Sequence, residues 1–164
     1  MASNVKTLTE VDETREAQQL RLRLQSVRPP AKRARSSNLI SGAYDWANSF
    51  VRGEPPELEQ TSDPRATERN ERKLREYFTN MRKKLNNPEE HAVQELRTMT
   101  HEQQRDVLTF WESASQFFSD VLDWLKEMFM AVCKKIRQCF RVVKSAIVNI
   151  FRQAKEMIRS FIDF

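Results

Sequence analysis

Residues 134–152 read KKIRQCFRVVKSAIVNIFR, a stretch that is strongly basic and strongly apolar at once. At 100° per residue, the charges and the apolar side chains of residues 134–164 separate onto opposite faces of one helix. The basic face spans an arc of about 80° and consists of Lys134, Arg137, Arg141, Lys144, Arg152, Lys155 and Arg159.

The opposite face is an apolar arc about 140° wide, which is broader than the seam of a strict coiled coil. Its main members are Ile136, Phe140, Val143, Ile147, Ile150, Phe151, Ile158 and Phe161. An apolar surface of this width must be covered by another helix, by another chain or by lipid. The stretch therefore predicts an amphipathic helix, and the fold depends on what covers it.

The segment just upstream is one candidate cover. Residues 101–130 carry a net charge of −4, whereas residues 131–164 carry +6. Apolar residues recur at steps of three and four through both segments, with one phase slip between residues 128 and 136. A chain that folds back near residue 131 would place acidic rims beside basic ones.

The residues around this slip, MFMAVCKKI (128–136), contain no Gly, Pro, Asn or Asp to mark a turn. Two arrangements therefore stay open. One is a small bundle with a helical hairpin. The other is a long coiled-coil-like helix over 100–164, whose charge asymmetry would suit an antiparallel homodimer.

The whole composition predicts an all-α protein. Only two of the 164 residues are glycine, which argues against a fold rich in tight turns. Further helices are expected at 9–27, 37–53, 64–86 and 88–98, with Pro64 at a first helical position and a capping box in residues 100–103 (THEQ). We expect residues 1–63 to form a largely disordered, flexible N-terminal third with short helices. Residues 64–164 should form the helical region, acidic over 100–130 and basic over 131–164.

The N-terminal third carries two short motifs. PPAKRAR, residues 29–35, resembles the short nuclear import signals of several viral nuclear proteins, with Lys32, Arg33 and Arg35 as its basic cluster. A solvated basic linker and a nonspecific nucleic-acid contact are the alternatives. Downstream, Leu39, Trp46 and Phe50 share one face of a short docking helix. This helix either packs on this protein's own helices or is a detachable motif that enters a partner's groove or a lipid surface.

Catalytic signatures do not appear in the sequence. A glycine-rich phosphate loop cannot be built, and the only histidines, His91 and His101, lie in polar surroundings. Cys133 and Cys139 are expected to be reduced thiols, with palmitoylation as the alternative. We therefore expect a non-enzymatic protein without a cofactor or metal.

The N-terminal residues MASNVKTLTE lack the apolar core of a secretory signal, and no run of 18 uncharged apolar residues exists. These features predict an intracellular protein that is membrane-associated, nuclear or both, and is not secreted. The combination of an import-like signal, short motifs and an amphipathic helix resembles the layout of small viral accessory proteins.

The leading hypothesis is a helical interaction protein whose basic amphipathic C-terminal helix binds an anionic membrane surface or a partner helix. The alternative is a nuclear protein or RNA-silencing suppressor that binds nucleic acid through helical basic faces. That alternative would use the cations of residues 64–86, namely Arg65, Arg69, Arg72, Lys73, Arg75, Arg82, Lys83 and Lys84. A solvated face with ion pairs such as Glu68–Arg72 and Glu71–Arg75 would explain the same pattern.

Overall fold

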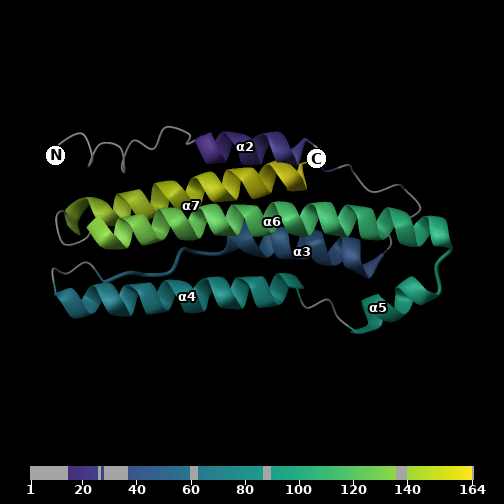
Figure 1. Ribbon diagram of the computed structural model, residues 1–164, viewed down its shortest axis with the longest axis horizontal. Helices are drawn as coiled ribbons and strands as arrows, with labels where there is room; N and C mark the ends of the chain where they lie inside the picture. Colours follow the sequence, from purple (N-terminus) through teal and green to yellow (C-terminus); the bar gives the residue numbers. More distant parts are fainter. Residues whose placement is uncertain are drawn as a thin grey trace.

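A computed structural model of the chain describes residues 15–25, 27, 37–59, 63–86, 90–135 and 140–163. Over these residues the chain is all-α, as predicted, and six helices pack into a bundle (Figure 1). They are α2 (Arg15–Leu24), α3 (Asn38–Arg52), α4 (Pro64–Asn86), α5 (Glu90–Arg97), α6 (His101–Lys135) and α7 (Phe140–Ile162).

The long helices α6 and α7 run antiparallel and make the most extensive contact in the bundle (Figure 1). α3 packs against both of them, α4 lies along α6, and α2 contacts both α6 and α7. Of the two arrangements left open by the sequence, the helical hairpin is therefore the one present, and residues 100–164 do not form one continuous helix. The joining residues 136–139 lie outside the described part.

Local capping chemistry sets several helix starts. The Ser37 hydroxyl accepts a hydrogen bond from the Leu39 amide at 3.2 Å, and an Asp63 carboxylate oxygen accepts one from the Arg65 amide at 3.0 Å. At α6, the Thr100 amide donates to the Gln103 side chain at 3.1 Å, and the Gln103 amide donates to the Thr100 hydroxyl at 3.2 Å. This reciprocal pair is the predicted capping box.

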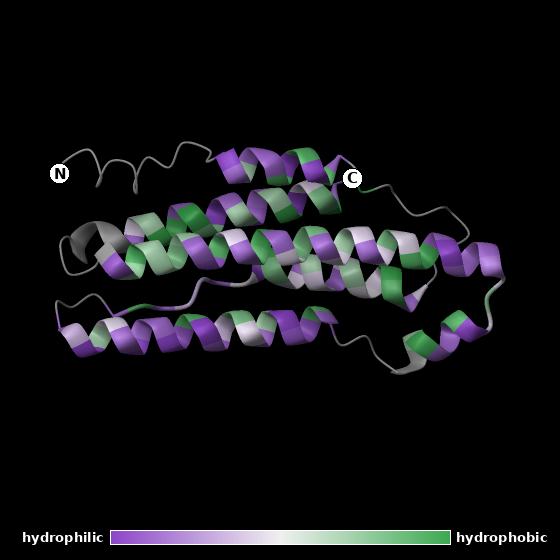
Figure 2. Ribbon diagram, in the orientation of Figure 1, coloured by the Kyte–Doolittle hydropathy of each residue, from purple (hydrophilic) through white to green (hydrophobic). Residues whose placement is uncertain are grey.

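Aromatic rings connect α3, α6 and α7 in the core. Trp46 stacks on Phe118 with ring centroids 4.7 Å apart, and Phe118 meets Phe161 edge-on at 4.7 Å. Phe50 and Phe151 join the same core at 5.3 Å. Figure 2 shows hydrophobic residues recurring along α3, α6 and α7, whereas α4 is mostly hydrophilic.

The prediction of a flexible N-terminal third is wrong for its described residues. Leu20 of α2 and Leu39, Trp46 and Phe50 of α3 are all buried, and both helices pack on the C-terminal hairpin. Burial of these side chains offsets the conformational entropy that a short isolated helix would lose on folding. The C-terminal hairpin therefore shares one hydrophobic core with these two helices.

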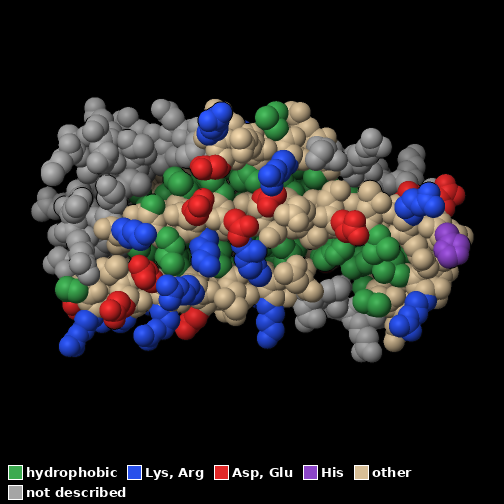
Figure 3. All heavy atoms as spheres, viewed as in Figure 1, with side chains coloured by type: hydrophobic (Ala, Val, Ile, Leu, Met, Phe, Trp, Pro, Cys, Tyr) green, Lys and Arg blue, Asp and Glu red, His purple; other side chains and the backbone are tan. Residues whose placement is uncertain are grey.

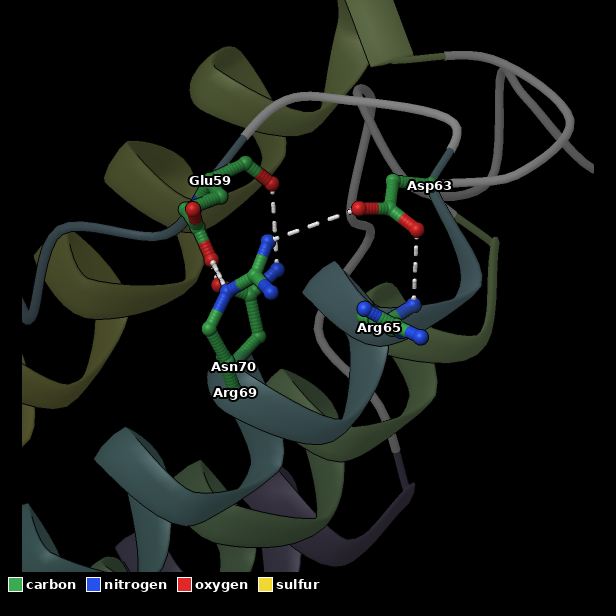
Figure 4. A network of polar contacts seen from close by, with 5 residues as sticks. All are labelled: Glu59, Asp63, Arg65, Arg69 and Asn70. Atoms are coloured by element: carbon green, nitrogen blue, oxygen red, sulfur yellow. Dashed lines mark hydrogen bonds and ion pairs between the residues drawn. The ribbon is translucent and has the colours of Figure 1, made fainter.

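An extended strap, residues 54–59, leads from α3 toward the start of α4 (Figure 1), and polar contacts hold its end on that helix (Figure 4). The fully buried Asn70 side chain accepts from the Glu59 amide at 2.8 Å and donates to the Glu59 carbonyl at 3.0 Å. Arg69 donates to the Glu59 carboxylate at 2.6 Å and lies 3.7 Å from Asp63. This hydrogen bond from Arg69 lowers the pKa of Glu59 below its ordinary value. Since these contacts anchor both the backbone and side chain of Glu59, they fix the strap on α4.

Candidate interaction surface on α7

The apolar arc of α7 is buried within the bundle. Ile147, Ile150, Phe151, Ile158 and Phe161 are at most 6% exposed, because α3 and α6 cover them. Ile136 lies outside the described residues, and the side chains of Phe140 and Val143 are likewise outside them. Helices of the same chain therefore cover the described members of this apolar arc, a point that the sequence left open.

The basic arc lies on the outside of the bundle. Lys144, Arg152 and Arg159 are exposed along α7, and Lys134 is exposed near the end of α6. Lys155 is half-buried, with its ammonium group 5.0 Å from the centroid of the Phe151 ring. Arg137 and the side chain of Arg141 fall outside the described part of the chain. The separation of charged and apolar faces predicted for this helix is thus observed wherever its side chains are described.

The acidic rim of α6 does not neutralise this basic arc. Asp120 pairs with Arg23 of α2, and Asp123 pairs with Arg82 of α4, which also donates to Ser119 at 3.0 Å. Among the described residues no α6 carboxylate forms an ion pair with an α7 cation, so the hairpin packs the two helices together without joining their rims through ion pairs there. These two carboxylates are engaged instead by cations of α2 and α4, which also pack on α6.

Lys144, Arg152 and Arg159 are exposed and form no ion pair within the described structure. They lie within the same arc of about 80° along about 22 Å of helix, at a rise of 1.5 Å per residue. The acidic residue beside them, Glu156, lies 3.9 Å from Arg21 of α2. The outer face of α7, defined here as Lys144, Val148, Arg152, Lys155 and Arg159, is therefore a surface of positive charge.

Val148 is a member of this face that sequence reasoning missed. It is 50% exposed, although its neighbours on the same arc are cations. The signal was available in the angular placement, because residue 148 falls at the centre of the basic arc and away from the apolar one. One aliphatic side chain among exposed cations gives the face an apolar contact point.

The other predicted motifs have different outcomes. Leu39, Trp46 and Phe50 of the docking helix lie in the protein's own core, which is the first of their two predicted placements. Lys32, Arg33 and Arg35 of the import-like motif lie outside the described residues. The described structure therefore provides no exposed docking face on α3 formed by its aromatic side chains.

Side chains arranged for metal binding or nucleophilic catalysis are sparse in the part of the chain that the structure describes. No cluster of three or more His, Cys, Asp or Glu residues could hold a metal ion there. Cys133 is fully buried, and loss of solvation raises the pKa of its thiol to about 11, which disfavours the reactive thiolate. A shallow depression of about 410 Å³ on α3 is lined by Asp45, Asn48, Ser49, Arg52 and Gly53.

None of the described helices is both long enough and apolar enough to cross a membrane. Comparisons of the chain with protein-family models, with curated proteins and with solved structures found no match.

Proposed function

We propose that this protein is a non-enzymatic interaction protein that binds an anionic membrane surface through the outer face of α7. The observation that carries the proposal is the row of exposed cations Lys144, Arg152 and Arg159 around the exposed Val148, cations that form no ion pair with any described residue. The bundle binds in its closed form, since the apolar arc of α7 remains buried against α3 and α6.

Electrostatics supplies the attraction in this proposal. Each Lys or Arg near an anionic bilayer contributes about 1 kcal/mol, within about one Debye length of the surface. The three unpaired cations therefore provide about 3 kcal/mol, and Arg21 limits the opposing effect of Glu156. An internally paired cation would contribute less, because forming the membrane contact would mean giving up its partner.

Val148 favours a bilayer over a purely polar partner. An aliphatic side chain can enter the boundary between headgroups and acyl chains, where its burial adds to the electrostatic attraction. A phosphate backbone offers no equivalent apolar region at its surface. The mixed chemistry of the face thus supports the membrane interpretation over a nucleic-acid one for α7.

Vesicle flotation tests the proposal with two variants of matched charge. The α7 variant carries Lys144→Gln, Arg152→Gln and Arg159→Gln, and the α4 variant carries Arg65→Gln, Arg72→Gln and Lys83→Gln. Each lowers the net charge from +5 to +2, and glutamine preserves helix propensity. We expect wild type to float with phosphatidylserine-containing vesicles and to remain behind with pure phosphatidylcholine.

The α7 variant should lose about 100-fold in partitioning, whereas the α4 variant should lose much less. Val148→Gln, which leaves the charge unchanged, should weaken flotation several-fold. Circular dichroism of each variant confirms that the bundle is intact. Equal losses in the two charge variants would show that bulk charge, and not the α7 face, controls binding, and failure of wild type to float would overturn the proposal.

A further inference from the structure

A second basic surface lies on α4, on the other side of α6 from α7 (Figure 1). Its exposed cations without an ion pair in the described structure are Arg65, Arg72, Lys73, Lys83 and Lys84. Arg65, Arg72 and Lys83 follow one line along the outer side of the helix over about 27 Å. Figure 3 shows basic side chains projecting along the lower edge of the molecule, where α4 lies, with acidic side chains among them.

The remaining arginines of α4 that the structure pairs are bound to carboxylates of the same chain. Arg69 is bound to Glu59 and Asp63, Arg75 lies 3.9 Å from Glu71, and Arg82 pairs with Asp123. The predicted Glu71–Arg75 pair is therefore present, but Glu68 and Arg72 form no ion pair in the described structure. Five exposed cations of α4 thus have no ion pair in the described structure, beside two exposed acidic residues of the same helix, Glu68 and Glu76.

α4 is held in place by polar contacts on its inner side. Trp46 of α3 donates from its indole nitrogen to the Met81 carbonyl at 3.3 Å, and Asn70 fixes the strap. With Arg82 bound to Ser119 and Asp123 of α6, these contacts attach the helix along its length. The outward cations therefore project from a fixed, straight rod, so a partner does not have to order the helix.

The outer side of α4 differs from that of α7 in having no exposed aliphatic or aromatic side chain. Among the described residues, the large hydrophobic side chains that are exposed are Leu22, Val93, Leu108 and Val148, and none belongs to α4. A contact made by cations alone suits a row of phosphates, which needs charge and hydrogen-bond donors but no apolar pocket.

We infer that the outer side of α4 binds the phosphate backbone of double-stranded nucleic acid without reading its sequence. A duplex carries one negative charge per about 1.7 Å of its axis, so a cationic rod of about 27 Å has ample phosphates within reach. This surface is independent of the α7 face, and it gives the bundle a second anionic ligand.

A salt series of fluorescence anisotropy with short labelled duplexes of DNA and of RNA tests the inference. If all five cations contact phosphates, the logarithm of the binding constant falls with the logarithm of salt concentration with a slope of about −4.5. The α4 variant should lose about three units of that slope, and the α7 variant should keep the wild-type value. Because phosphates alone are contacted, changing the duplex sequence should not alter affinity.

Three results would overturn the inference: no binding by wild type at low salt, an unchanged slope in the α4 variant, or equal losses in both variants. Vesicle flotation of the same protein samples distinguishes failure of the α4 inference from failure of the membrane proposal. An α4 variant that floats normally but binds duplex more weakly, with the reduced salt slope, supports both surfaces. A wild type that floats but ignores duplex removes only the α4 inference.

Discussion

α4 and α7 are helices of equal length, 23 residues each, that differ in how they are attached and in what they expose. α7 is attached mainly by apolar burial against α3 and α6, with Arg21–Glu156 as its ion pair at the side. α4 is attached by a smaller apolar set, chiefly Leu74, Phe78 and Leu85, and by the polar contacts of Asn70 and Arg82. Two basic helices of the same length, α4 and α7, are thus attached to the bundle by different interactions.

The difference also shows why a count of cations does not identify a partner. On α4, three arginines are engaged by neighbouring carboxylates, whereas the α7 cations Lys144, Arg152 and Arg159 have no carboxylate partner among the described residues. On α7, an exposed valine lies among the charges, and on α4 no large hydrophobic side chain is exposed. Pairing and apolar exposure, which depend on the fold, distinguish the two faces.

The largest expected effect concerns the apolar attachment of α7. Phe161→Ala removes a fully buried ring that contacts Tyr44 at 5.1 Å, Phe110 at 5.9 Å and Phe118 at 4.7 Å. We expect the free energy of unfolding to fall by about 3–5 kcal/mol, because a cavity replaces these contacts. Denaturant titration followed by circular dichroism measures it. A loss below about 1 kcal/mol would contradict apolar burial as the attachment of α7.

A smaller effect is expected for the polar attachment of α4. Asn70→Ala leaves the Glu59 amide and carbonyl without their side-chain partner, which should cost about 1–3 kcal/mol of unfolding free energy. The matched control is Asn80→Ala on the exposed side of the same helix, expected to change stability by no more than about 0.5 kcal/mol. If the two variants proved equally stable in the same titration, the strap would have no role in holding α4.

Local chemistry made much of the fold predictable. Pro64 and the capping box of Thr100 and Gln103 set helix starts within a residue or two, because capping depends on neighbours in the chain. The hairpin was not decided by the sequence, since residues 128–136 contain no turn residue. Burial of the aromatic core, including Phe118 and Phe161, favours the packed hairpin over the local preference for a continuous helix.

The candidate surface was predictable only in part. Angular placement located the exposed cations of α7, but it did not show which would remain unpaired. Ion pairing depends on tertiary contacts such as Arg23–Asp120 and Arg82–Asp123, between residues that are 97 and 41 positions apart in the chain. The sequence also predicted one apolar face on the docking helix. Which surface packs against that face depends on tertiary structure, in which Trp46 stacks on Phe118 of α6.

The most direct test asks whether the two basic faces can be occupied together. Labelled duplex is mixed with phosphatidylserine-containing vesicles and the protein, and the duplex that floats with the vesicles is measured. We predict that wild type carries duplex to the vesicles, and that the α7 variant and the α4 variant each fail to do so. Displacement of bound duplex by added vesicles would instead show that both ligands compete for one surface, which contradicts the separate roles assigned to α4 and α7.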